Sequence, residues 1–496
     1  MTQNDRAFFG HPRGLATLFF TEMWERFSYY GMRALLILFM TAGVEAGGLG
    51  FAVDKAGAIY GLYTASVYLL SLPGGWLADR FLGQRKAVLY GGIIIALGHF
   101  SMAFPMLGTF YFGLVLISCG TGLLKPNVST MVGTLYEQGD VRRDAGFSIF
   151  YMGINLGAFI APLVCGYFGQ NVNWHLGFAL AGVGMTLGLI QYLAGARSLG
   201  DAGLYPTPAA DEREAAVLRG QLFRGMGSVV VLCVALALLG VTGVVEYTPA
   251  WISNAFGLGM IGLVIVTFGL MFTTGEWTPG ERNRLIVVAV FFFASALFWG
   301  VFEQAGSTLN LFADRNTETR ILGWAFPSSW FQSANAMFII LLAGVFAWIW
   351  VKLGKNDPSS GTKFSIGLIS AGLGFAVLIP AAQLSGGGEK VSPLWLLGVF
   401  FLHTVGELCL SPVGLSAMTK LAPARVGGFV MGIWFLATAL GNYMGGRVAS
   451  LYESFSLAEL FGAVAATAIV AGLLLAVFVK PIARLAAGEQ ERTGSG

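Results

Sequence analysis

The sequence predicts an all-α protein that crosses a membrane many times, and three observations support this prediction. Hydrophobic residues make up 56% of the 496 residues, the mean hydropathy is +0.72, and only 11% of the residues are charged, against about 25% in soluble domains. A helix that crosses a bilayer needs about 20 mainly apolar residues, and the chain contains fourteen such runs. The runs cover residues 15–42, 56–78, 86–105, 109–134, 145–169, 175–196, 225–245, 254–275, 285–311, 328–352, 364–385, 393–418, 426–450 and 457–479.

The first apolar run contains charged residues that a membrane helix rarely carries. Because a helix turns by about 100° per residue, its polar side chains fall within an arc of roughly 140°. They are Glu22, Glu25, Arg26, Tyr29, Tyr30 and Arg33. Charged groups at bilayer depth are costly and usually face a bundle interior or a water-filled pathway. We expect this face to line a pathway, because a structural ion pair between Glu22 and Arg26, four residues apart, would explain only two of the six residues.

Several motifs resemble those of a known transporter family. The stretch Glu22–Gly31 reads Glu-x-x-Glu-Arg-Phe-x-Tyr-Tyr-Gly and resembles the first-helix motif of the proton-dependent oligopeptide transporter family, a branch of the major facilitator superfamily. Residues Phe147–Phe159 resemble the second motif of this family. The loop Gly74–Lys86, with Asp79 among basic residues, resembles a cytoplasmic loop motif of the superfamily, and no equivalent is found near Lys352–Lys363 in the second half.

The resemblance implies a major facilitator fold with two six-helix bundles and, as in bacterial members of the family, two extra transmembrane helices between them. The runs 225–245 and 254–275 are the surplus pair, because they follow the polar stretch 197–221 and contain no charge. We expect them to pack outside the pathway. The predicted domains are an N-terminal bundle (1–196), a cytoplasmic linker (197–224), the two extra helices (225–275), a C-terminal bundle (285–480) and a cytoplasmic tail (481–496).

Basic residues predict the orientation of the chain. With fourteen spans both termini lie on one side of the membrane, and the loops of that side contain 21 of the 29 Lys and Arg residues, against five in the opposite loops. The remaining three, Arg26, Arg33 and Lys125, lie inside the membrane. Because cytoplasmic loops carry an excess of Lys and Arg, we expect both termini to be cytoplasmic, in a bacterial inner membrane.

Charges in later helices predict contacts between the two bundles. The fourth and tenth helices of the two bundles are repeat equivalents, and they carry Lys125 and Glu407. We therefore expect a Lys125–Glu407 salt bridge that closes one side of the cavity. Pro126, which follows Lys125, is expected to free a backbone carbonyl that also faces the cavity.

Carboxylates outnumber bases inside the membrane. The membrane interior holds four acids, which are Glu22, Glu25, Glu303 of the seventh helix and Glu407, and three bases, which are Arg26, Arg33 and Lys125. If every base is paired, one acid remains to carry a proton. On the first helix Glu22 and Glu25 compete for Arg26, and we expect at most one of them to be well paired.

The family resemblance implies roles for individual residues. The residues for proton coupling are Glu22, Glu25, Arg26 and Glu303. The residues for substrate binding are Arg33 and Lys125 at the peptide carboxylate, Asn155, Asn335 and Glu407 near the amino end, and Tyr29, Tyr30, Tyr68 and Trp434 around the cavity. A zwitterionic peptide matches this division, because Arg and Lys bind carboxylates through charge-assisted hydrogen bonds and Glu407 offers an anion to an amine.

We expect a proton-coupled symporter of di- and tripeptides that works by alternating access. The coupling ion is the proton, and we expect no cofactor or metal, no nucleic-acid partner and no enzymatic activity; a single chain in the lipid bilayer should suffice. Alternatives are the same scaffold carrying nitrate or peptide-like drugs, or a proton-drug antiporter. An intramembrane enzyme is disfavoured, because no Ser/His dyad or metal cluster occurs at helical spacing.

Overall fold

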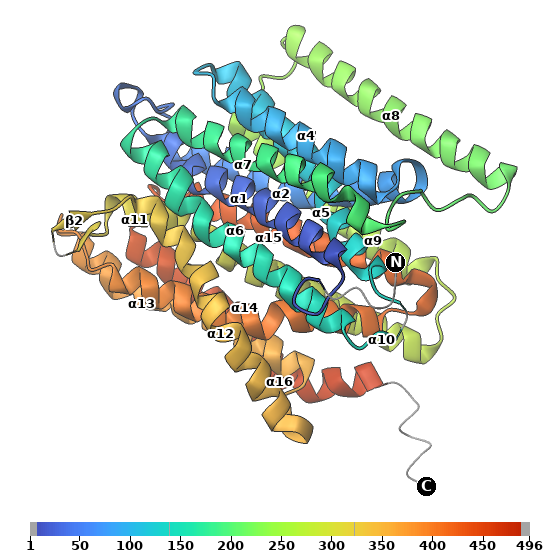
Figure 1. Cartoon of the computed structure of the whole chain (residues 1–496). Coiled ribbons are helices and arrows are strands. Elements are labelled where there is room, and N and C mark those ends of the chain that lie inside the picture. Colours follow the sequence, from blue (N-terminus) through green and yellow to red (C-terminus); the bar gives the residue numbers. More distant parts are fainter. Residues whose placement is uncertain (1–6, 138, 322, 488–496) are drawn as a thin grey trace.

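The computed structural model describes residues 7–487 except 138 and 322, and in these residues the chain is almost entirely helical (Figure 1). The α-helices are α1 (Arg13–Thr41), α2 (Val53–Leu69), α3 (Ser71–Leu77), α4 (Gln84–Met102), α5 (Leu107–Thr134), α6 (Arg143–Asn171), α7 (Trp174–Gly195), α8 (Glu212–Val241), α9 (Pro249–Thr273), α10 (Pro279–Phe302), α11 (Thr308–Arg315), α12 (Gln332–Leu353), α13 (Ser360–Ser385), α14 (Leu394–Leu421), α15 (Gly427–Ala449) and α16 (Leu457–Ala487). Two short antiparallel strands, β1 (Arg320–Ile321) and β2 (Trp324–Ala325), follow α11.

These helices form fourteen long helical segments within the described residues, since α3 continues α2 and α11 continues α10. By length and composition alone, ten segments of the described chain are long and apolar enough to cross a membrane. Of the remaining segments, α1 carries the buried charges and α2 is only 17 residues long. The prediction of an all-α membrane protein is confirmed, and the protein is an integral membrane protein.

Close backbone contacts build the first bundle around α1, and small residues make these contacts possible. Helix α1 packs against α6 and α7, and most of its side chains are buried, including the charged ones. A Cβ added to Gly157 of α6 would overlap the carbonyl oxygen of Met23. One added to Gly153 would lie 3.0 Å from the carbonyl of Phe19. Only glycine allows α6 this close to the charged face of α1.

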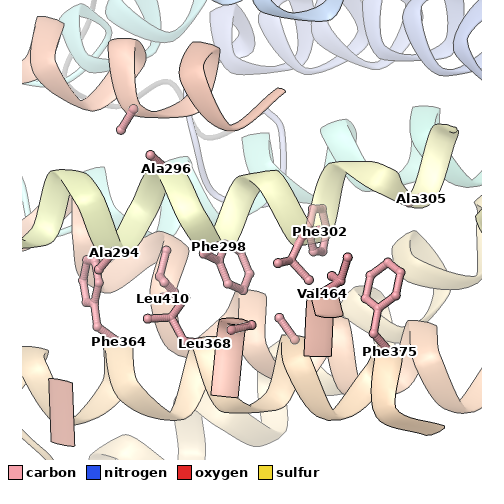
Figure 2. Close-up of a cluster of buried hydrophobic side chains, with 14 of the residues drawn as sticks. Ala294, Ala296, Phe298, Phe302, Ala305, Phe364, Leu368, Phe375, Leu410 and Val464 are labelled. Carbon is pink, nitrogen blue, oxygen red and sulfur yellow. The ribbon is translucent and has the colours of Figure 1, made fainter. Parts of the chain in front are cut away.

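Aromatic side chains fill the second bundle, where α10 packs against α13, α14 and α16 (Figure 2). The rings of Phe291 and Phe364 stack with centroids 4.4 Å apart. Phe298 and Phe302 of α10 stack at 5.6 Å. This packing holds the end of α10 in place, and the chain turns there at Glu303.

The two bundles meet at the end of the molecule that carries α11 and the β1–β2 strands, here called the hairpin side. The opposite end, where α1 begins and α16 ends, is the terminal side (Figure 1). On the hairpin side α2 packs against α15, where a Cβ on Gly446 would overlap the backbone of Gly61. The Ser333 hydroxyl of α12 also donates to the Phe159 carbonyl of α6 at 2.7 Å. The hairpin side is therefore closed.

The surplus helices α8 and α9 lie outside the two bundles. Helix α8 has no buried residue and lies apart from the other helices in Figure 1. Helix α9 contacts both α2 and α15, and the Tyr443 hydroxyl of α15 donates to the Ser253 carbonyl of α9 at 2.9 Å. Helix α9 thus lies beside the contact between the bundles.

Candidate functional site

The polar face of α1 holds a buried cluster of three charged residues. Glu22, Glu25 and Arg26 are each at most 3% exposed. The Arg26 Nε atom lies 3.2 Å from Glu22 Oε1 and donates a hydrogen bond to Glu25 Oε2. Only the Glu25 contact is a hydrogen bond, whereas Glu22 lies within ion-pair distance of the same Nε atom. The expectation that at most one of the two acids is well paired agrees with this conformation, because a single Nε–H can donate only one good hydrogen bond.

A second buried ion pair joins the two bundles. Arg33 Nη2 of α1 lies 2.6 Å from Glu303 Oε2 and also donates to the Glu303 backbone carbonyl at 3.2 Å. Arg33 Nε donates to the Tyr60 hydroxyl of α2 at 2.8 Å. Arg33 and Glu303 are 4% and 5% exposed. In this conformation Arg33 is held by Glu303 and Tyr60, and its role at a peptide carboxylate stays a prediction.

A break in the helix brings Glu303 to Arg33. The apolar run 285–311 predicts one continuous helix, but α10 ends at Phe302 and a 3-10 turn, Glu303–Gly306, leads into α11. A Cβ on Gly306 would lie 2.6 Å from Arg33 Nε and would overlap the Tyr60 hydroxyl. Glycine at this turn is what lets the guanidinium and the phenol approach the backbone of the second bundle.

Lys125 and Glu407 do not form the predicted salt bridge. The Lys125 Nζ lies 3.9 Å from the centroid of the Tyr68 ring, on its own bundle. Glu407 Oε2 accepts a hydrogen bond of 3.0 Å from Asn335 Nδ2, also on its own bundle. The ion pairs of the described residues include neither side chain. The pair is open in this conformation, and its role as a gate that closes and opens stays a prediction, because repeat symmetry indicates which helices face each other but not when they touch.

The remaining predicted substrate residues differ in exposure. Tyr30, Tyr68 and Asn335 are half-buried, as are Lys125 and Glu407. The other three, Tyr29, Asn155 and Trp434, are at most 6% exposed. Asn155 donates to the Tyr151 carbonyl of its own helix at 2.9 Å, so Asn335, and not Asn155, is the amide that holds Glu407.

The carbonyl that Pro126 frees does not face the cavity as expected. Proline lacks the N–H that would bond the carbonyl four residues earlier, which belongs to Gly122. A Cβ on Gly74 of α3 would overlap this Gly122 oxygen. The freed carbonyl therefore lies against the backbone of α3, where α3 packs on α5.

The loop Gly74–Lys86 lies on the terminal side and binds the segment after α7. Arg85 Nε donates to the Ala202 carbonyl at 2.8 Å, and the backbone N–H of Thr207 donates to the Asp79 carbonyl at 2.8 Å. The Asp79 carboxylate accepts from Gln84 Nε2 at 3.1 Å. The loop thus ties the first bundle to the linker at the side opposite the Arg33–Glu303 pair.

Two site residues were not singled out from the sequence. Tyr60 binds Arg33, and the Thr404 hydroxyl accepts from Asn335 Nδ2 at 3.0 Å. Tyr60 lies in an apolar run among other tyrosines, and Thr404 is a single hydroxyl in helix α14. Neither shows a pattern that separates it from ordinary packing residues.

The site therefore has two parts with different properties. On the hairpin side the Arg33–Glu303–Tyr60 group is buried and joins the bundles. Toward the terminal side a lysine and a carboxylate, Lys125 and Glu407, are half-buried on opposite bundles without ionic partners among the described residues. Such a pair of open charges can receive a small molecule that carries both an anionic and a cationic group.

Comparisons with known proteins cover nearly the whole chain. A sequence model of the POT family matches residues 85–467. The peptide transporter YePEPT of Yersinia enterocolitica subsp. palearctica is 44% identical over 501 residues, which cover 98% of this chain and 97% of that protein. A di-/tripeptide transporter of Lactococcus lactis subsp. cremoris is 38% identical, with 98% of both chains covered.

The fold also matches a solved structure. A peptide transporter POT in complex with sulfate superposes with a TM-score of 0.90 at 46% sequence identity, and 97% of each chain is covered. Both bundles and the two helices between them lie within this coverage.

Proposed function

This chain belongs to the POT family, and we propose that it transports di- and tripeptides together with protons by alternating access. The observation that carries the proposal is the half-buried pair Lys125 and Glu407, which lie on facing bundles and lack ionic partners among the described residues. Relatives named peptide transporter and di-/tripeptide transporter support the same substrate class.

The two open charges define how a peptide would bind. Lys125 would attract the peptide carboxylate, while Glu407, oriented by Asn335, would accept hydrogen bonds from the amino group. The half-buried ring of Tyr68 lies beside Lys125, and the half-buried ring of Tyr30 lies beside Arg33 on the same bundle. A simple anion such as nitrate would gain from Lys125 but would be repelled by the Glu407 carboxylate, so the site favours a zwitterion.

Proton coupling would act on the buried carboxylates. Protonation of Glu303 would remove the charge that holds Arg33 and would weaken the contact between the bundles on the hairpin side. Arg33 would then be free to bind a peptide carboxylate in the alternate conformation. Glu22, Glu25 and Arg26 lie nearer the terminal side on the same helix and would pass the proton on.

The orientation follows from the charge of the loops. Basic residues are concentrated on the terminal side, so we assign this side to the cytoplasm in a bacterial inner membrane. The closed hairpin side then faces outward, and the conformation described here is inward-facing. One chain contains both bundles and both charged groups, so a monomer would suffice for transport.

Uptake into liposomes tests this function. Purified full-length protein is reconstituted, an inward proton gradient is imposed, and radiolabelled dialanine is followed. We expect accumulation that a protonophore abolishes and that unlabelled di- and tripeptides inhibit, whereas nitrate does not. Inhibition by nitrate without inhibition by peptides would contradict the proposed substrate. Equal accumulation with and without the proton gradient would contradict the coupling.

A further inference from the structure

A large apolar pocket lies away from the charged site, between α2, α5 and the start of α9. Its volume is about 500 Å³, within the usual range of small-molecule sites, about 300–1,000 Å³. Ile59 of α2, Leu114 of α5 and Ile252 of α9 are among its lining residues. The three helices cross the membrane, so the pocket lies at the depth of the bilayer hydrocarbon. Its position between a bundle and the inserted helices gives it three walls.

The pocket opens toward lipid. At its rim Val115 of α5 and Ile252 of α9 are 59% and 39% exposed. Both are apolar side chains of membrane-crossing helices, where exposure means contact with acyl chains. The medium that reaches the pocket is therefore hydrocarbon and not water.

The polar groups of the lining also disfavour water as an occupant. The Ser66 hydroxyl donates to the Leu62 carbonyl at 2.7 Å, and the Ser118 hydroxyl donates to the Leu114 carbonyl at 2.9 Å. The Tyr63 ring lines the pocket, and its buried hydroxyl has no hydrogen-bond partner among the described residues. A bound water needs two to four polar partners, and of these three hydroxyls only that of Tyr63 is unpaired, because both serines donate to carbonyls of their own helices.

One hydroxyl fits the polar end of a lipid. Tyr111 lies in the second turn of α5, on the hairpin side, and lines the same pocket. Its hydroxyl has no hydrogen-bond partner among the described residues, and tyrosine is common at membrane interfaces, where its ring and hydroxyl meet apolar and polar surroundings. An acyl chain could lie in the pocket while its ester group meets Tyr111 near the membrane surface.

We propose that this pocket binds one acyl chain of a membrane phospholipid. The chain completes the packing between α5 and the inserted pair α8–α9, whose helix α9 also contacts α15 through Ser253 and Tyr443. The site is separate from the charged groups of the proposed transport pathway, and the binding claim does not depend on the transported substrate.

Photochemical crosslinking in liposomes tests the proposal. The full chain is reconstituted with a phosphatidylcholine that carries a diazirine on its acyl chain, and labelled peptides are mapped by mass spectrometry after irradiation. We expect stronger labelling of the α2 and α5 pocket segments than of the lipid-facing surface of α7 around Ile190, which is 61% exposed. Equal labelling of both regions would overturn the proposal.

Substitutions that fill the pocket distinguish crosslinking by a lipid bound there from crosslinking by the surrounding bilayer. Ser118→Trp should fill the pocket and lower its labelling to the level of the α7 surface, whereas the matched control Ile190→Trp should leave it unchanged. Val115→Trp, at the exposed rim, serves the same purpose if Ser118→Trp does not fold. Undiminished labelling in the pocket variants would contradict the site. Dialanine uptake in the same liposomes tests the transport function independently, so either claim can fail alone.

Discussion

At the residue scale, the charged side chains differ in whether their charge is already satisfied. Arg33 is bound by Glu303 and Tyr60, and Arg26 is bound by two carboxylates. Lys125, by contrast, makes no ion pair among the described residues and lies over the face of the Tyr68 ring, an interaction weaker than a buried ion pair. A substrate should therefore meet Lys125 first, while Arg33 responds to changes at Glu303.

Lys125→Met should weaken binding of dialanine by about ten- to hundredfold, because a charge-assisted hydrogen bond to the peptide carboxylate contributes about 1.5–3 kcal/mol. Binding is measured by competition with a labelled peptide. A dipeptide amidated at its carboxyl end should bind equally weakly to wild type and variant. If amidation weakens binding as much in the variant as in wild type, Lys125 does not bind the peptide carboxylate.

Glu303→Gln should separate proton coupling from substrate binding. Glutamine keeps the shape of the protonated acid but cannot hold the Arg33 charge, and loss of one partner of a buried pair is strongly destabilising, about 3–5 kcal/mol. We expect acid-driven accumulation of dialanine to fail while exchange without a gradient continues. Glu459→Gln, at an exposed helix start, is the matched control. Normal driven accumulation in Glu303→Gln would remove this residue from the proton route.

At the element scale, glycine contacts decide how closely helices from different bundles approach. Helices α2 and α15 meet backbone to backbone at Gly61 and Gly446, and α1 meets α6 in the same way at Gly157. The first contact lies between bundles that must separate during transport, and the second lies within one bundle. The α2–α15 contact is therefore the one whose closure should depend on conformation.

Gly446→Ala should prevent closure of the hairpin side. The new methyl group would overlap Gly61, and such overpacking typically costs about 1–3 kcal/mol, equivalent to about a 5- to 150-fold shift in a conformational equilibrium. We expect slower dialanine uptake and greater reactivity of a reporter cysteine placed on the hairpin side. Gly344→Ala, where a methyl group meets nothing within 4 Å, should behave like wild type. Unchanged uptake and reactivity in Gly446→Ala would show that α2 and α15 do not close the pathway.

At the scale of the whole molecule, two seams close the hairpin side, with the Arg33–Glu303 pair between them. One seam is α2 against α15. The other is α6 against α12 and the 3-10 turn Ser328–Phe331 that precedes it, where Gln170 donates to the Ser328 hydroxyl at 2.8 Å. Because both seams join opposite bundles, transport requires both to separate. Fixing either one should hold the molecule in the conformation described here.

A disulfide across the second seam should stop transport reversibly. An ideal Cβ at Gly166 lies 3.2 Å from the Cβ of Ser329, close to the separation of about 3.5–4.5 Å found in disulfides. We expect the oxidised variant Gly166→Cys/Ser329→Cys to lose dialanine uptake and to regain it after reduction, while it still binds peptide from the terminal side. Each single cysteine variant should be insensitive to oxidant. Full uptake by the crosslinked protein would contradict alternating access through this seam.

The fourteen apolar runs, the polar face of α1 and the family were predictable from the sequence, because hydropathy, helical period and motif spacing are local properties of the chain. The charged residues inside the membrane could also be identified from the sequence. Their roles as binding or coupling groups remain predictions, since the geometry shows only where each side chain lies.

Only the tertiary structure decided which charges meet. Arg33 and Glu303 are 270 residues apart, and their contact needs the break after Phe302, the glycine at position 306 and closure of the hairpin side. The sequence instead favoured Lys125 with Glu407, a pairing that repeat symmetry allows but this conformation separates. Composition and periodicity describe each helix by itself, whereas an ion pair between bundles depends on the distance between helices, which changes as the transporter changes conformation.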